Sequence, residues 1–96
     1  MKFKRLASFI KDFDGLNRED QIIVNKSFKD VSKALSGDVE LYKKFKVKKM
    51  KKYKEDGIYE GHLEINLVFT LHFEYDEIEK ICYFRRIGDH SIYKNP

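Results

Sequence analysis

Apolar side chains recur at intervals of three and four residues near the start of the chain. Phe3, Leu6, Ile10 and Phe13 follow this spacing, and Gly15 comes two residues later. The spacing places the four side chains on one face of a helix, and glycine commonly follows the last residue of a helix. The pattern therefore predicts a first helix from Phe3 to Phe13.

A second stripe with the same period predicts a second, longer helix. Its apolar positions are Val24, Phe28, Val31 and Leu35. Asn17 can cap the start of this helix, acidic side chains at 19 and 20 suit its first turn, and Gly37 marks its end. Because only a short link around Leu16 separates the two helices, we expect an antiparallel helical hairpin whose apolar faces need a covering layer.

From Ile58 onward the apolar period changes to two. Apolar and polar positions alternate over 59–65 and again over 67–73, which predicts two strands with a turn around Asn66. This turn sets the expected cross-strand pairs, which are Leu63 with Phe69 and Tyr59 with Phe73 on the apolar face, and His62 with Thr70 and Glu60 with His72 on the polar face.

A third strand over 80–87 follows a turn at Asp76 and Glu77, and Gly88 ends it. The order of elements predicts an α+β domain, with the helical hairpin packed on an antiparallel sheet of three to four strands. The fourth strand would be an edge strand in the basic connector around Val47. A solvated loop there is the alternative.

Composition fits one small domain spanning residues 1–96. Hydrophobic residues make up 42% and aromatic residues 15%, enough for a real core. No apolar run approaches the roughly 20 residues of a membrane span, and charges from Lys11 onward interrupt any signal peptide. The single cysteine, Cys82, is expected to be a buried strand residue and favours a reducing, cytoplasmic location.

Charge is concentrated in one segment. Eight lysines and no acid lie between Lys43 and Lys54, at positions 43, 44, 46, 48, 49, 51, 52 and 54, whereas acids outnumber bases in the rest of the chain. Clustered lysines suit a polyanion, because they displace counterions from a phosphate backbone. A solvated loop or an acidic protein partner remains the alternative.

Three stretches resemble the RelE/ParE toxin superfamily of type II toxin–antitoxin systems. They are FKVKKMKKYK, GIYEGHLEINLVFTLHF and FRRIGDHSIYKNP, and together with the helical hairpin they extend the resemblance over most of the chain. The last stretch is similar to the R-x-G-x-H ending of the YafQ-like branch. The resemblance implies a YafQ- or RelE-like toxin that cuts messenger RNA, usually inside the ribosome. It also implies a cognate antitoxin that holds the toxin inactive, within a hetero-oligomer.

The resemblance also assigns site residues, position by position. His62 on the first strand, His90 after the third strand and Tyr93 in the tail match places where these families keep functional residues. Arg85 and Arg86 lie near the region where members set basic residues against RNA.

The chain departs from the family at several positions. Glu60 stands where the RelE branch tends to have lysine, and Asn66 and Leu67 stand about where many members have arginine or aspartate. Tyr93 lies one place before the aromatic residue of the YafQ ending. The first helix is also expected to start directly, without the leading strand of many members.

The residue types suit metal-free RNA cleavage, which needs a base for the 2′-hydroxyl, an acid for the leaving 5′-oxygen and cations for the phosphate. His62 and His90 can supply the proton transfers in either order. Tyr93 can stack on a base or bond a phosphate, and Arg85 or Arg86 can neutralise charge, with the two expected on opposite strand faces. The RNA-binding lysines are expected to be Lys46, Lys48, Lys49, Lys51, Lys52 and Lys54.

Structural roles compete with these assignments. His62 can be a solvated strand residue, Tyr93 can cover the end of the core, and His72 is expected to pair with Glu60. The three histidines match no zinc-binding spacing, so neither a metal nor another cofactor is expected.

Two other functions remain open at this point. One is a non-catalytic toxin of the ParE kind that inhibits DNA gyrase, and the other is an RNA-binding module that uses the lysines only for phosphate affinity.

Overall fold

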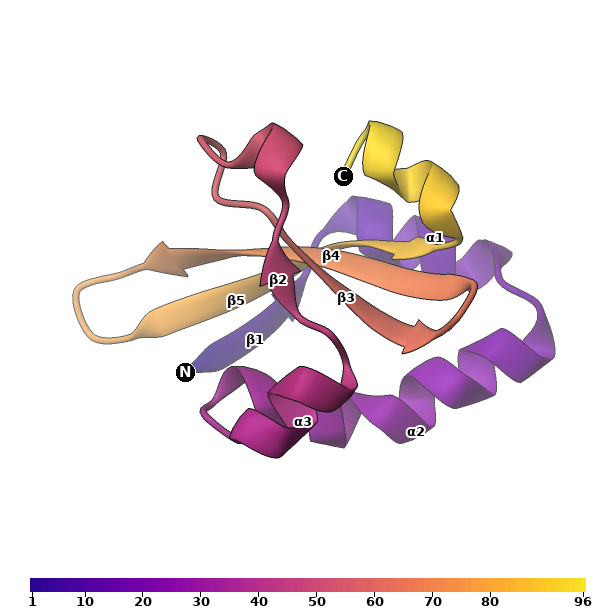
Figure 1. The fold of residues 1–96 in the computed structure, drawn as a ribbon, viewed down its shortest axis with the longest axis horizontal. Coiled ribbons are helices and arrows are strands. Elements are labelled where there is room, and N and C mark those ends of the chain that lie inside the picture. Colours follow the sequence, from indigo (N-terminus) through magenta and orange to yellow (C-terminus); the bar gives the residue numbers. More distant parts are fainter.

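The strands and helices follow the order expected from the sequence, with a leading strand and a short third helix added. The structure, a computed structural model that describes residues 1–96, is shown in Figure 1. Its elements are β1 (Lys2–Arg5), α1 (Ala7–Gly15), α2 (Arg18–Leu35), α3 (Val39–Lys44), β2 (Lys48–Lys49), the 3-10 turn η1 (Lys51–Tyr53), β3 (Tyr59–Glu64), β4 (Leu67–Tyr75), β5 (Lys80–Gly88) and the 3-10 turn η2 (His90–Lys94). None of the helices has the length and apolar character needed to cross a membrane.

All five strands form one sheet in the order β1-β5-β4-β3-β2. The pairs from β5 to β2 are antiparallel, as expected, whereas β1 runs parallel to β5. The predicted α+β class is confirmed. The sheet is wider than the three to four strands expected, because β1 adds a fifth strand at the edge opposite β2.

The leading strand β1 corrects the prediction that the chain enters its first helix directly. Phe3 pairs with Cys82 of β5, and its ring stacks on Phe84 with ring centroids 6.1 Å apart. The first helix therefore begins at Ala7, after Leu6, whose N–H donates to the Phe84 carbonyl oxygen. Phe3 fits the helical spacing, but it is also the single inward residue of a short alternating segment. Pairing with β5 favours the strand over the helix at this position.

The second helix begins and ends where its caps predict. The Asn17 side chain accepts a hydrogen bond from the Asp20 N–H at 2.8 Å, and Gly37 follows the last turn with φ of 123°. The short helix α3 comes next and has no counterpart among the predicted elements. Asp38 caps it by accepting from the Leu41 N–H, so the lysine-rich segment begins inside a helix.

The β3–β4 hairpin has the predicted faces but a register shifted by two residues. The observed pairs are Tyr59 with Leu71, Glu60 with Thr70, Gly61 with Phe69 and His62 with Val68. The turn is tighter than expected, because only Ile65 and Asn66 separate the paired residues Glu64 and Leu67. A shift of two preserves which side chains share a face, since the period of a strand is two.

The basic connector is anchored by apolar side chains that alternate with its lysines. Phe45, Val47 and Met50 are buried, whereas the lysines between and after them are exposed. The edge strand that the sequence left open is present as β2, in which Lys48 pairs with Glu60 and Lys49 with Tyr59.

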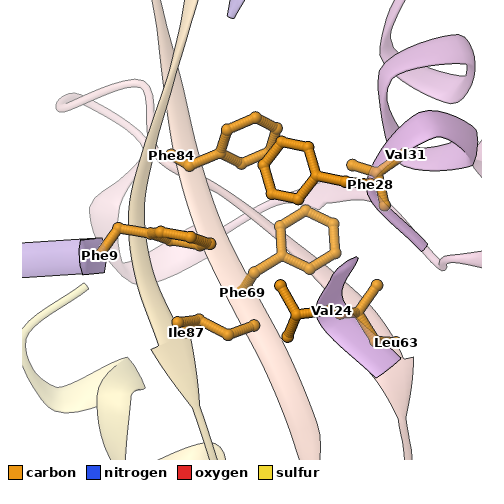
Figure 2. Close-up of a pocket in the computed structure, with 8 residues that line it drawn as sticks. All are labelled: Phe9, Val24, Phe28, Val31, Leu63, Phe69, Phe84 and Ile87. Carbon is orange, nitrogen blue, oxygen red and sulfur yellow. The ribbon is translucent and has the colours of Figure 1, made fainter. Parts of the chain in front are cut away.

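The core lies between the helices and one face of the sheet. Figure 2 shows its centre, where Phe9 of α1 and Phe28 of α2 face Phe69 and Phe84 on neighbouring strands. The void enclosed there is about 10 Å³, roughly one water molecule, so it is a packing gap and not a ligand site. Cys82 is fully buried in this sheet, as expected.

The opposite face of the sheet is covered only in part. The covering elements are η1 and residues 89–96, which include η2 and which we call the C-terminal segment. In Figure 1 both lie above the sheet, whereas α2 and α3 lie below it. The hydroxyl of Tyr53 in η1 donates to the Lys94 carbonyl oxygen at 3.0 Å, which joins the two coverings. We call the face of the sheet that η1 and the C-terminal segment cover the outer face.

Candidate functional site

Two histidines that are far apart in the sequence meet on the outer face. The rings of His62 on β3 and His90 at the start of η2 have centroids 5.8 Å apart. His62 is half-buried, and His90 is exposed. The Tyr93 ring lies edge-on to His90, with centroids 5.4 Å apart. The fold thus brings together three of the predicted site residues, His62 from β3 and His90 and Tyr93 from η2.

A buried carboxylate lies directly beside His62. Glu60 is 9% exposed, and its Oε1 lies 3.5 Å from His62 Nε2 and 3.8 Å from Lys48 Nζ. The sequence predicts Glu60 as the cross-strand partner of His72 and as a departure from the family, but not as part of the site. The signal that could have placed it in the site is its position two residues before His62, on the same polar strand face.

Tyr93 is held as a neutral phenol. Burial, together with the neighbouring Glu60 carboxylate, raises the pKa of the Tyr93 hydroxyl far above its usual range. The hydroxyl therefore stays protonated at neutral pH, where it can donate a hydrogen bond but cannot act as a base.

A local cap fixes the start of the segment that carries His90. The Asp89 carboxylate accepts from the Ser91 N–H at 2.8 Å, and this hydrogen bonding lowers the pKa of Asp89. Ile92, two residues after His90, is buried against the sheet. The cap and this anchor together direct the His90 side chain towards His62.

Both predicted arginines contact the C-terminal segment. Arg85 Nε donates to a main-chain oxygen of Pro96 at 3.1 Å, and Arg86 Nη1 donates to the Asn95 carbonyl oxygen at 3.0 Å. The expectation that they point to opposite faces is wrong. The register of β4 and β5 shifts between Thr70 and Leu71, so a β-bulge at Arg85 interrupts the alternation and lets both guanidinium groups reach one segment.

His72 lies outside the histidine pair and does not pair with Glu60, because Glu60 is opposite Thr70. Its Nδ1 lies 2.9 Å from Arg85 Nη1, and its ring stacks on Tyr83 with centroids 5.1 Å apart. Burial, and then the Arg85 charge, lower the pKa of His72. It lines a separate open cleft of about 570 Å³ beside Pro96.

The lysines flank the histidine pair on two sides. Lys46 lines a shallow cleft with His62, and Lys48, Lys51 and Lys52 line another with Glu60. Lys49 also borders the second cleft, but its Nζ lies 5.6 Å from the Tyr59 ring. Lys54 is exposed beyond η1.

No group of three or more His, Cys, Asp or Glu side chains is placed to hold a metal ion.

Comparisons with known proteins identify the fold. Neither a family model nor a curated protein matches the sequence. Among solved structures, a YoeB/ParE toxin from Agrobacterium tumefaciens matches with a TM-score of 0.66 and 17% identity, over 94% of this chain and 99% of that one. The chain has the RelE/ParE toxin fold.

A second solved structure agrees with the first. The conserved hypothetical protein HP0894 from Helicobacter pylori matches with a TM-score of 0.58 and 23% identity, over 95% of this chain and 96% of that chain. Both comparisons cover nearly the whole of both chains. The RelE/ParE fold here is thus present without large insertions or missing elements.

On this RelE/ParE fold the predicted site residues form two groups. His62, His90 and Tyr93 converge with Glu60, and the lysines lie around them. Arg85 and Arg86 are instead bound to the C-terminal segment, and Arg86 also pairs with Asp12 of α1. No local pattern in the sequence indicated Asp12 as the partner of Arg86.

Proposed function

We propose that this chain is the toxin of a type II toxin–antitoxin pair and that it is a metal-independent endoribonuclease acting on messenger RNA at the ribosome. The observation that carries the proposal is the His62–His90 pair, 5.8 Å apart and flanked by lysines, on a RelE/ParE fold. Cytoplasmic location follows from this target.

Cleavage would proceed by attack of the ribose 2′-oxygen on the adjacent phosphorus. A base takes the 2′-hydroxyl proton, the bond between phosphorus and the 5′-oxygen breaks, and an acid protonates that oxygen. A cyclic phosphate and a free 5′-hydroxyl result. Two imidazoles whose centroids are 5.8 Å apart can lie on either side of one phosphate.

The neighbours of the two histidines favour one order of proton transfer. Glu60 faces His62 Nε2 and stabilises the imidazolium that forms when His62 accepts a proton, so we assign His62 as the base. His90 is exposed on the tail and is assigned as the acid. The Tyr93 hydroxyl is buried, so we assign its half-buried ring the role of supporting a base by stacking.

The lysines would bind phosphates on both sides of the cut. Lys46 and Lys48 lie on either side of the His62–Glu60 pair, and Lys51 and Lys52 continue the cationic surface into η1. Exposed lysines separated by buried anchors provide phosphate affinity without reading sequence.

A cognate antitoxin is the expected protein partner. An acidic, partly disordered segment could neutralise the lysines and cover the histidines, forming an inactive hetero-oligomer. Co-expression with the product of a neighbouring gene for a small acidic protein, followed by size-exclusion chromatography, tests for that complex.

The decisive experiment adds the purified protein to a defined translation reaction and maps the 5′ ends of the message, with matched RNA lacking ribosomes. His62→Ala, His90→Ala and Tyr93→Phe are compared with wild type, and Tyr75→Phe, a change at a tyrosine that is 75% exposed on the β4–β5 hairpin, is the control. We expect ribosome-dependent cuts that both histidine variants lose and that Tyr75→Phe keeps.

Other results identify other functions. Cuts without ribosomes would indicate a free ribonuclease. An intact message with continued growth arrest and inhibited gyrase would replace the proposal by a ParE-like activity. Salt-sensitive RNA binding without cuts would indicate a non-catalytic RNA-binding module.

A further inference from the structure

Three side chains hold three consecutive main-chain oxygens at the end of the C-terminal segment. Tyr53 Oη donates to Lys94, Arg86 Nη1 to Asn95 and Arg85 Nε to Pro96, at 3.0, 3.0 and 3.1 Å. The donors come from η1 and β5, so the segment is fixed from two sides. We call these three hydrogen bonds the clamp. All three acceptors are main-chain oxygens, so the clamp does not depend on the side chains at 94–96.

Asp12 of α1 holds the central donor of this clamp. Its Oδ2 accepts from Arg86 Nε at 2.6 Å, and its Oδ1 accepts from Arg86 Nη2 at 3.1 Å. The Ile87 N–H also donates to Asp12 Oδ2, at 3.2 Å. The planar guanidinium thus bonds the helix on one side and the Asn95 carbonyl on the other, which a lysine ammonium could not reproduce.

The β-bulge explains why the successive residues Arg85 and Arg86 both donate to the C-terminal segment. Regular alternation would direct Arg85 and Arg86 to opposite faces, but the pairing passes from Arg86 with Thr70 to Phe84 with Leu71 and leaves Arg85 unpaired. Arg85 also contacts His72 Nδ1, which fixes its guanidinium against β4.

We propose that Asp12, Arg85 and Arg86 are positioning residues that fix the segment carrying His90 and Tyr93 against the sheet, with Asp12 acting through Arg86. The sequence predicted that an arginine here contacts RNA, whereas both guanidinium groups are occupied by contacts within the protein. The consequence for activity rests on the proposed function. The consequence for the order of the segment does not.

The test combines amide hydrogen exchange with cleavage kinetics on the full chain. Asp12→Asn and Arg86→Lys are compared with Asp14→Asn and Arg18→Lys, which change exposed residues of α1 and α2 by the same chemistry. The reporting amides are those of Ile92 and Asn95, which bond within η2. Amides of β4 and β5 report whether the sheet stays folded.

We expect exchange at Ile92 and Asn95 to be at least about tenfold faster in Asp12→Asn and Arg86→Lys, with the sheet amides unchanged. The kcat for RNA should fall about a hundredfold, because the acid is misplaced, while KM changes by less than about twofold. Both control variants should match wild type.

Two results would overturn the proposal. One is unchanged exchange at Ile92 and Asn95 in both test variants. The other is full kcat in Arg86→Lys with a raised KM in Arg86→Gln, the pattern of direct RNA contact. If loss of the ion pair unfolds the sheet, Tyr53→Phe serves as the test variant, because it removes another donor of the clamp. Hydrogen exchange at Ile92 and Asn95 should then be faster than in wild type. Unchanged exchange in Tyr53→Phe would also reject the clamp. A wild-type protein that cuts no RNA would refute the proposed function and leave the exchange test in force.

Discussion

The ring of Phe69 on β4 lies directly over Gly61 on β3. A Cβ atom at position 61 would stand 2.3 Å from Phe69 Cζ and 2.7 Å from Cε1. Glycine at 61 therefore leaves the space that the Phe69 ring fills in the core. We expect Gly61→Ala to destabilise the protein by about 1–3 kcal/mol, because the ring must leave its packed position. Urea denaturation measures the change.

Gly15→Ala is the matched control, since a Cβ there meets nothing within 4 Å. Its effect on the free energy of unfolding should be small. The steric explanation also requires that Phe69→Leu reduce the cost of Gly61→Ala, and a purely additive double variant would contradict it.

Thr70 of β4 provides a second test of packing in the sheet. It is fully buried, and no group of the protein lies in hydrogen-bonding geometry with its Oγ1. Thr70→Val keeps the shape and removes a buried hydroxyl, so we expect unfolding free energy to be unchanged or raised by up to about 1 kcal/mol. A loss of more than about 1 kcal/mol in chemical denaturation would show that the hydroxyl has a partner that stabilises the fold.

His72 should make stability fall in mild acid. Burial and Arg85 lower its pKa in the folded state below the 6.5 of the unfolded chain, so folding disfavours its protonation. Its contribution is complete above about pH 6.5 and is lost as pH falls towards the lowered value. Between pH 7.5 and 5.5 wild type should therefore lose more unfolding free energy than His72→Gln. Equal losses would contradict the assignment, as would an NMR titration of His72 above 6.5.

Cys82 should be chemically silent in the folded protein. It is fully buried, and burial raises the pKa of its thiol from 9.0 to about 12, so almost no thiolate is present at pH 8. We expect a disulfide reagent to leave the native protein unmodified and to react with one thiol after urea unfolding. Rapid stoichiometric reaction without denaturant would mean that β5 opens readily.

The lysines should determine the salt dependence of RNA binding. Each lysine that contacts a single-stranded phosphate contributes about 0.7 to the slope of log affinity against log salt. Lys46→Gln combined with Lys51→Gln should lower that slope by about 1.4. Lys26→Gln combined with Lys29→Gln, at exposed positions of α2, removes the same charge and should leave the slope unchanged. Equal effects of the two pairs would indicate that net charge alone attracts RNA.

Local sequence patterns predicted the helices and strand faces that neighbouring residues determine. The stripe from Val24 to Leu35 and the cap at Asn17 predicted α2, because helical periodicity and capping are properties of neighbouring residues. Alternation predicted the faces of β3 and β4 for the same reason. It could not distinguish registers two residues apart, because both bury the same side chains.

The elements that sequence reasoning missed depend on distant contacts. Phe3 is a strand residue only because Cys82 and Phe84 are beside it. In the site, the polar strand face and the resemblance indicated His62 and His90. Nothing near Arg86 in the sequence pointed to Asp12, which lies 74 residues away.

The parallel pairing of β1 with β5 has a consequence for synthesis. Ser8, just after β1, donates to the Arg85 carbonyl oxygen 77 residues further along the chain. A nascent chain leaves the exit tunnel from its N-terminus, so β1 emerges early and has no strand to join until β5 follows. The loop that must close is almost the entire chain, which makes this pairing a late and slow step of folding. His90 and Tyr93 follow β5, so the histidine pair is complete only after translation of this segment has finished.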